Sequence, residues 1–89
     1  MAYLDVLCAA GQWQAVAHYP SGVHNAGGSQ CKVMVTSGAT PTTNDGSLRL
    51  NSTGILTADN LSDWFGDVAG AAKVFVRFDA AGVVAVTNG

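Results

Sequence analysis

Alternating apolar and polar residues mark the segments of the first half of the chain that we expect to form strands. Tyr3–Cys8 alternates, and although its apolar residues also fit one face of a helix, we favour a strand. Gln12–Tyr19 and Cys31–Thr36 alternate in the same way, and Cys31–Thr36 is rich in the β-branched residues that strands favour. Val23–Gln30 has little apolar content and several Gly, Ser and Asn residues, so we expect an exposed loop there.

The second half of the chain returns to alternation on either side of one different segment. Ser47–Asn51 alternates briefly after a loop rich in glycine and hydroxyl residues. Lys73–Phe78 and Val83–Thr87 read as strands rich in valine. Their connection, Asp79–Gly82, is short and ends in a glycine that can take a positive φ, so we expect these two strands to pair as a hairpin.

A helical period replaces the alternation in the segment between these strands. Leu61, Trp64 and Phe65 recur at the spacing of one helix face, so we expect them to pack the helix on the sheet, with Trp64 as the buried anchor. Thr57 can accept a backbone N–H bond in the first turn, and Gly66 suits the end of the helix. The pattern therefore predicts a helix of two or three turns.

These elements predict a mostly β chain, a small antiparallel β-sandwich or barrel with about six strands and one short helix. There is no internal repeat and no linker long enough to divide the chain, so residues 1–89 are expected to form a single compact domain. Phe75 lies opposite Val74 and Val76 on its strand, which predicts that both faces of that strand are covered. The candidate core or interface residues are the large apolar ones: Trp13, Leu61, Trp64, Phe65, Phe75 and Phe78.

The composition adds that the surface carries little charge. Charged residues make up 11% of the chain, against about 25% in an average soluble domain, and hydrophobic residues make up 48%. This balance excludes intrinsic disorder and predicts a surface that partner proteins cover. Four Lys and Arg residues and a net charge of -2 argue against nucleic-acid binding. The apolar stretches are too short to span a membrane, and Met1–Ala10 is a poor secretory signal, so we expect an intracellular start.

Cysteine and histidine are the first candidates for chemistry. Cys8, His18, His24 and Cys31 have the donor atoms of a zinc site, but their separations lack the close pairs that organise such sites. We expect two buried thiols and two surface histidines instead, with a disulfide between the cysteines as the less favoured alternative. A Cys/His nucleophilic pair would also need an orienting group and an oxyanion hole, and no motif signals either.

Aspartate supplies every acidic residue, because the chain has no Glu. Asp59, Asp63 and Asp67 recur every four residues, so on a continuous helix they form one acidic stripe. A calcium site or a site for a basic partner could use this stripe, but calcium ligands normally share a tight loop, and a solvated face is the expected role. No second carboxylate completes an acid/base pair. We therefore expect no catalytic residue, no metal and no cofactor.

Two loops carry weaker signals for ligands. Gly27-Gly28-Ser29 precedes a strand and lacks the known phosphate-binding patterns, so it is expected to be only a flexible loop. Trp13 lies between Gln12 and Gln14, and an exposed Trp beside amide side chains is typical of carbohydrate binding. These residues keep a small ligand-binding β module of the carbohydrate-binding type open as the alternative function.

The overall texture of the chain is rich in Ala, Gly, Val, Thr, Ser and Asn, with Thr/Gly loops such as Ser37–Gly46. In this composition and strand rhythm it resembles small virion proteins of tailed bacteriophages, of the capsid-decoration or fibre-attachment type. The resemblance implies a non-enzymatic virion structural protein that is made in the host cytoplasm. It also implies binding to the major capsid or tail protein, or to copies of itself, with trimers at a symmetry axis typical of such proteins.

Overall fold

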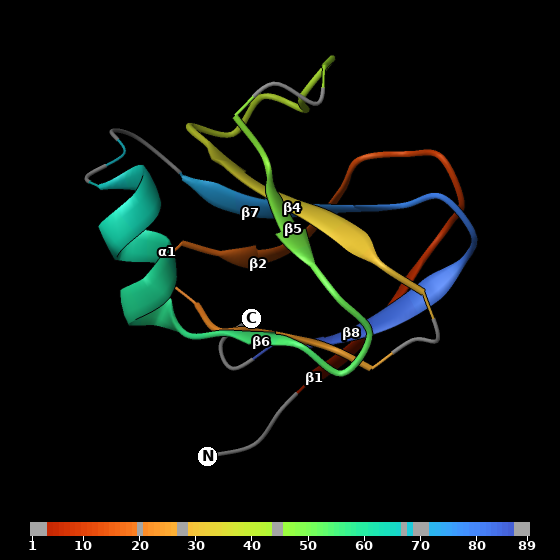
Figure 1. Ribbon diagram of the computed structural model, residues 1–89. Helices are drawn as coiled ribbons and strands as arrows, with labels where there is room; N and C mark the ends of the chain where they lie inside the picture. The colour runs from red at the N-terminus through yellow and green to blue at the C-terminus, as the bar shows by residue number, and fades with distance from the viewer. Residues whose placement is uncertain are drawn as a thin grey trace.

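The computed structural model describes residues 4–19, 21–26, 29–43, 46–66, 68 and 72–86, which form two facing layers of antiparallel strands and one short helix (Figure 1). This architecture confirms the mostly β, sandwich-like class, with eight strands where about six were expected. The elements in chain order are β1 (Leu4–Cys8), β2 (Gln14–His18), β3 (Val23–Asn25), β4 (Cys31–Thr36), β5 (Leu48–Leu50), β6 (Ile55–Leu56), α1 (Ala58–Phe65), β7 (Lys73–Phe78) and β8 (Gly82–Val86).

The strands form two four-stranded sheets, in the orders β1-β8-β3-β6 and β2-β7-β4-β5. The expected hairpin of β7 and β8 is therefore wrong, because the two strands lie in different sheets and the Asp79–Gly82 segment crosses between them. A Cβ atom at Gly82 would come within 2.5 Å of the Phe78 ring, so close packing at the crossover requires this glycine. A short glycine-containing connection looks the same in sequence whether the next strand pairs alongside or crosses to the facing layer.

The expectation of an exposed loop at Val23–Gln30 is also wrong for the first part of that segment. Its first three residues form β3, which pairs with β8 on one side and β6 on the other. Val23 and Asn25 are buried, and the Asn25 side-chain amide donates to the carbonyl oxygens of Ser29 at 2.7 Å and Leu50 at 3.2 Å. These bonds allow a polar residue to occupy an interior strand position at little cost. Gly27 and Gly28 lie outside the described residues.

The core lies between the two sheets. Val74, Val76 and Phe78 point inward from β7 and are each 0% exposed, as their alternation predicted. An irregularity of register between Ala15 and Ala17 in β2 leaves both Val16 and Ala17 buried, where strict alternation placed them on opposite sides.

The helix α1 has the predicted cap and end. The Thr57 hydroxyl accepts from the Asn60 backbone N–H at 3.1 Å, the Asn60 side-chain oxygen accepts from the Thr57 N–H at 3.0 Å, and Gly66 has φ 67°. Leu61 is fully buried and Phe65 packs partly against the core.

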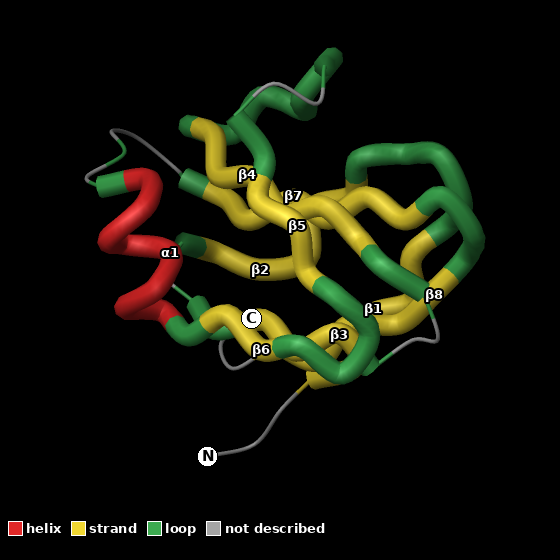
Figure 2. Tube along the Cα trace, viewed as in Figure 1, coloured by secondary structure: helices red, strands yellow, loops and turns green. Residues whose placement is uncertain are grey.

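Trp64 is not the buried anchor, because 63% of its surface is exposed. The apolar contact of this eight-residue helix is narrow and centres on Leu61 and Phe65, which are four residues apart. Trp64, three residues after Leu61, is rotated about 60° around the helix axis from Leu61, in the direction opposite to Phe65. It therefore lies at the flank of the contact. Figure 2 shows the helix at one end of the two layers of strands.

Candidate functional site

The candidate residues of the sequence do not gather at one place. Leu61 and Phe78 lie in the core, Phe65 is half-buried against it, and Trp64 is exposed on α1. The other two also separate: Trp13 is half-buried before β2, and Phe75 is 2% exposed although it points away from the core. The surfaces with functional potential are instead the two outer faces of the sandwich.

The outer side of the β1-β8-β3-β6 sheet is nearly free of charge, and we call it the apolar face. Strand register places Leu7 beside Val83, and it places Asp5, Ala85, His24 and Ile55 in one row across the four strands. Leu7 is 77% exposed and Ile55 is 57% exposed. Among the described residues, these two and Trp64 are the large hydrophobic side chains that the surface leaves exposed.

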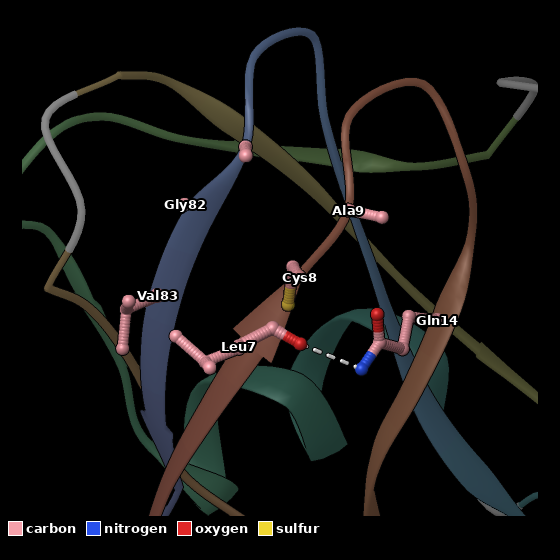
Figure 3. A pocket seen from close by; sticks show the side chains of 7 residues that line it. Leu7, Cys8, Ala9, Gln14, Gly82 and Val83 are labelled. Carbon is pink, nitrogen blue, oxygen red and sulfur yellow. Dashed lines mark hydrogen bonds between the residues drawn. The ribbon is translucent and has the colours of Figure 1, made fainter.

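A shallow hollow opens at the β1 edge of the apolar face (Figure 3). The Gln14 side-chain amide donates to the Leu7 carbonyl oxygen at 2.8 Å and fixes one wall of the hollow. Among the described residues of the lining, Cys8 is the one ionisable side chain. Burial raises the pKa of its thiol, so it is a poor nucleophile at neutral pH. The hollow can hold an apolar side chain. Its lining residues are Leu7, Cys8, Ala9, Gln14, Ala81, Gly82 and Val83.

The outer side of the β2-β7-β4-β5 sheet has the opposite character, and we call it the basic face. It carries Lys32, Arg49, Lys73 and Arg77, which are all the Lys and Arg residues of the chain. Register places Arg49, Lys32 and Arg77 directly side by side on β5, β4 and β7. On the same face, Lys73 lies between Thr36 and His18.

An apolar row separates the two groups of cations on the basic face. Met34, Phe75 and Ala15 are neighbours in register on β4, β7 and β2. Phe75 and Met34 are 2% and 8% exposed on this outward-facing row. Phe75 is thus covered within the chain itself, as its position opposite Val74 and Val76 predicted.

Among the described residues, the positive charges of the basic face have little negative charge beside them. Within the described residues, the one carboxylate within 4 Å of these cations is Asp79, whose Oδ1 lies 3.8 Å from the Arg77 Nη1. Adjacent strands lie about 4.8 Å apart, so Lys32 has a like charge on each side, an arrangement that destabilises a sheet. The sequence did not reveal this cluster because its members are spread over three separate strands, although their alternation with apolar residues already placed each one outward.

The four zinc donor candidates do not converge. Cys8 and Cys31 are buried and free, in strands of opposite sheets. His18 points outward from one sheet and His24 from the other, so the sandwich lies between them. Burial, with a smaller contribution from the nearby Cys8, raises the pKa of Cys31 to about 12, so both thiols are neutral at pH 7. Among the described residues, no three His, Cys or Asp side chains are grouped to hold a metal ion.

The carbohydrate-binding alternative gains no support from its candidate residues. Trp13 is half-buried, and the amide of Gln14 is bonded to the Leu7 carbonyl. Of the two amides beside the tryptophan, that of Gln12 is exposed.

Two of the three aspartates of the expected acidic stripe lie on α1. Asp59 and Asp63 are both exposed, on the side of the helix away from the buried Leu61. Asp67 lies outside the described residues. The two described aspartates offer a negative surface at the end of the sandwich.

No protein-family model, no characterised protein and no solved structure matches this chain. In the described part of the chain, no helix is both long enough and apolar enough to cross a membrane. The two outer faces and the helix are therefore the surfaces that bear on function.

Proposed function

We propose that this protein is a non-enzymatic assembly subunit that covers its apolar face against a second copy of itself. The observation that carries the proposal is the exposure of Leu7 and Ile55, at 77% and 57%, on the same side of one sheet. In keeping with the resemblance in composition, the proposed setting is a bacteriophage virion, where such a subunit decorates a capsid or tail lattice.

The exposed side chains of this face favour a contact. Burying one Leu or Ile side chain contributes about 1.5–3 kcal/mol. Because Leu7 is 77% exposed and Ile55 is 57% exposed, Leu7 can still contribute most of this free energy and Ile55 about half of it when a partner covers them. A stable interface covers about 800 Å² on each partner, about a sixth of the 4809 Å² accessible surface of this chain. A face with a single carboxylate, Asp5, can also meet its own copy across a twofold axis without strong repulsion.

Contact through the face is favoured over strand pairing along the β1 edge. Edge strands invite pairing with another chain because their backbone groups are unpaired. The Gln14 amide already bonds the outward carbonyl of Leu7, so an added strand would have to displace it. The side chains of the sheet, and not the edge of β1, are therefore the proposed contact.

Sedimentation velocity of the purified chain tests the proposal. At high ionic strength, where charged contacts between copies are screened, wild type should associate at micromolar concentration. Under the same conditions Leu7→Thr/Ile55→Thr should sediment as a folded monomer, because Thr suits a strand but removes the apolar surface. Leu7→Ile is the matched control and should associate like wild type. A wild-type chain that stays monomeric at about 100 μM would overturn the proposal, as would unchanged association of the double variant.

A further inference from the structure

We propose that the basic face binds the acidic side of helix α1 of a second copy of this chain. The inference rests on the proposed self-assembly and adds a second, charge-driven contact to it. It starts from the separation of charge in the molecule: the four cations lie on one sheet face, and Asp59 and Asp63 lie on the helix at the end of the sandwich.

The basic face cannot pair with its own copy. Arg49, Lys32 and Arg77 already repel one another across β5, β4 and β7, and a second such row would add to the repulsion. Its occupant must bring negative charge. A partner with negative charge relieves the repulsion between these three cations. The free energy that this repulsion costs when the sheet forms is therefore recovered when the partner binds.

Helix α1 has the charge and spacing for that role. Asp59 and Asp63 are one turn apart, about 6 Å along the axis, which matches cations on strands about 4.8 Å apart. The last turn of α1 carries no basic residue. Trp64 is 63% exposed at the flank of the same helix, where it can lie over Arg77 or Arg49 as a cation–π partner.

The contact must form between copies. Within one chain, Leu61 and Phe65 hold α1 against the core beside β6, which is the edge strand of the other sheet. The acidic side of the helix therefore points away from the core, and among the described residues no cation of the basic face lies within 4 Å of Asp59 or Asp63. A contact between two different surfaces is heterologous, so it propagates into a closed ring or a filament instead of stopping at a dimer.

A second copy fits better than a nucleic acid. The whole chain has four cations, one of them engaged with Asp79, and a net charge of -2. Affinity for a phosphate backbone grows with the number of phosphates neutralised, and this number stays small here. The carboxylates of the chain itself are the anions present at the highest local concentration in an assembly.

A charge-swap experiment tests the contact at low ionic strength, with sedimentation and thermal melting as readouts. Lys32→Glu and Asp63→Lys, each made in the Leu7→Thr/Ile55→Thr background, should each associate at least about tenfold more weakly than that background alone. An equimolar mixture of the two variants should recover association. The unchanged helix of Lys32→Glu can bind the unchanged basic face of Asp63→Lys, and the reversed charges are complementary at the opposite contact. Lys32→Glu should also melt at a higher temperature than its background, because it removes two like-charge contacts.

Matched controls separate the contact from net charge. Asp63→Asn and Thr42→Lys both raise the net charge by one at exposed positions, and only Asp63→Asn should weaken association. A mixture that fails to recover association overturns the inference, and so does equal weakening by the two controls. Saturable, salt-sensitive binding of a short duplex DNA to the basic face, with no effect of Asp63→Asn on association, overturns it in favour of a nucleic-acid partner.

The apolar-face background also distinguishes this inference from the proposed function. Salt-sensitive association that survives Leu7→Thr/Ile55→Thr and is lost with Lys32→Glu supports the charged contact even where the apolar contact fails. Association that depends on Leu7 and Ile55 but ignores salt, Lys32 and Asp63 leaves the proposed function standing and overturns the inference.

Discussion

The two outer faces of the sandwich come from the same alternation of residues but have opposite surfaces. On the apolar face, Leu7 and Ile55 project into solvent and no Lys or Arg lies among the described residues. On the basic face, every Lys and Arg of the chain is present, and the large apolar side chain, Phe75, is 2% exposed. One face exposes hydrophobic residues and carries little charge, and the other carries the cations while its large hydrophobic residue is covered.

This difference decides what each face can meet. Apolar surface without charge is complementary to itself, whereas a row of cations is complementary only to something acidic. It also decides what each residue contributes to folding, because a covered side chain stabilises the monomer and an exposed one can stabilise only a complex. The following variants test this contrast.

Phe75→Ala and Leu7→Ala should give the largest contrast. Phe75 is covered within the monomer, so its truncation should cost about 3–5 kcal/mol and lower the Tm by more than about 10 °C. Leu7→Ala should change the free energy of unfolding of the dilute monomer by less than about 0.5 kcal/mol. Urea unfolding followed by circular dichroism measures both. Equal destabilisation by the two variants would contradict the assignment of Phe75 to a covered row.

Leu61→Ala and Trp64→Ala extend the contrast to the helix that is proposed to meet the basic face. Leu61 is 0% exposed, so its loss should cost about 2–5 kcal/mol, whereas loss of the exposed Trp64 should cost less than about 1 kcal/mol. Thermal melts at low protein concentration compare them. A Trp64→Ala variant that melts far below wild type would show that the helix packs on its flank after all.

Raising the pH should weaken the core that joins the two faces. Burial raises the pKa of Cys31 to about 12, and that of Cys8 also lies above the ordinary value of 9.0, so between pH 9 and 12 the unfolded chain loses these protons first. Stability is therefore full below pH 9 and falls as the pH rises toward 12. Urea titrations at pH 8, 9.5 and 10.5 measure the decline. Cys31→Ala should show a shallower slope with pH, and an identical slope would contradict this origin.

Charge reversal at a single site should give the smallest change in the free energy of unfolding, and this change should differ between the two faces. Lys32→Glu replaces two like-charge neighbours with two opposite ones, and should stabilise the monomer by about 0.2–1 kcal/mol for each pair. Asp5→Lys, the reversal available on the apolar face, has no cation beside it in register and should stay within about 0.5 kcal/mol of wild type. Destabilisation by Lys32→Glu would show that the row is compensated.

The sequence by itself determined the local elements. Cys31–Thr36 and Lys73–Phe78 are strands at the predicted bounds, and Thr57 and Gly66 bound the helix as predicted. Alternation and capping are readable because they depend on neighbours within a few residues, where backbone geometry fixes which side each residue faces. The same alternation already placed each cation outward from the core.

Only the tertiary structure decided which elements lie beside one another. The connection after Phe78 crosses to the facing sheet, Val23–Asn25 becomes an interior strand, and four scattered cations gather on one face. Trp64 is exposed because the helix contact is narrow, which its spacing alone could not reveal. Strand pairing and burial depend on contacts between residues distant in sequence, and local patterns carry no information about which distant partner is chosen.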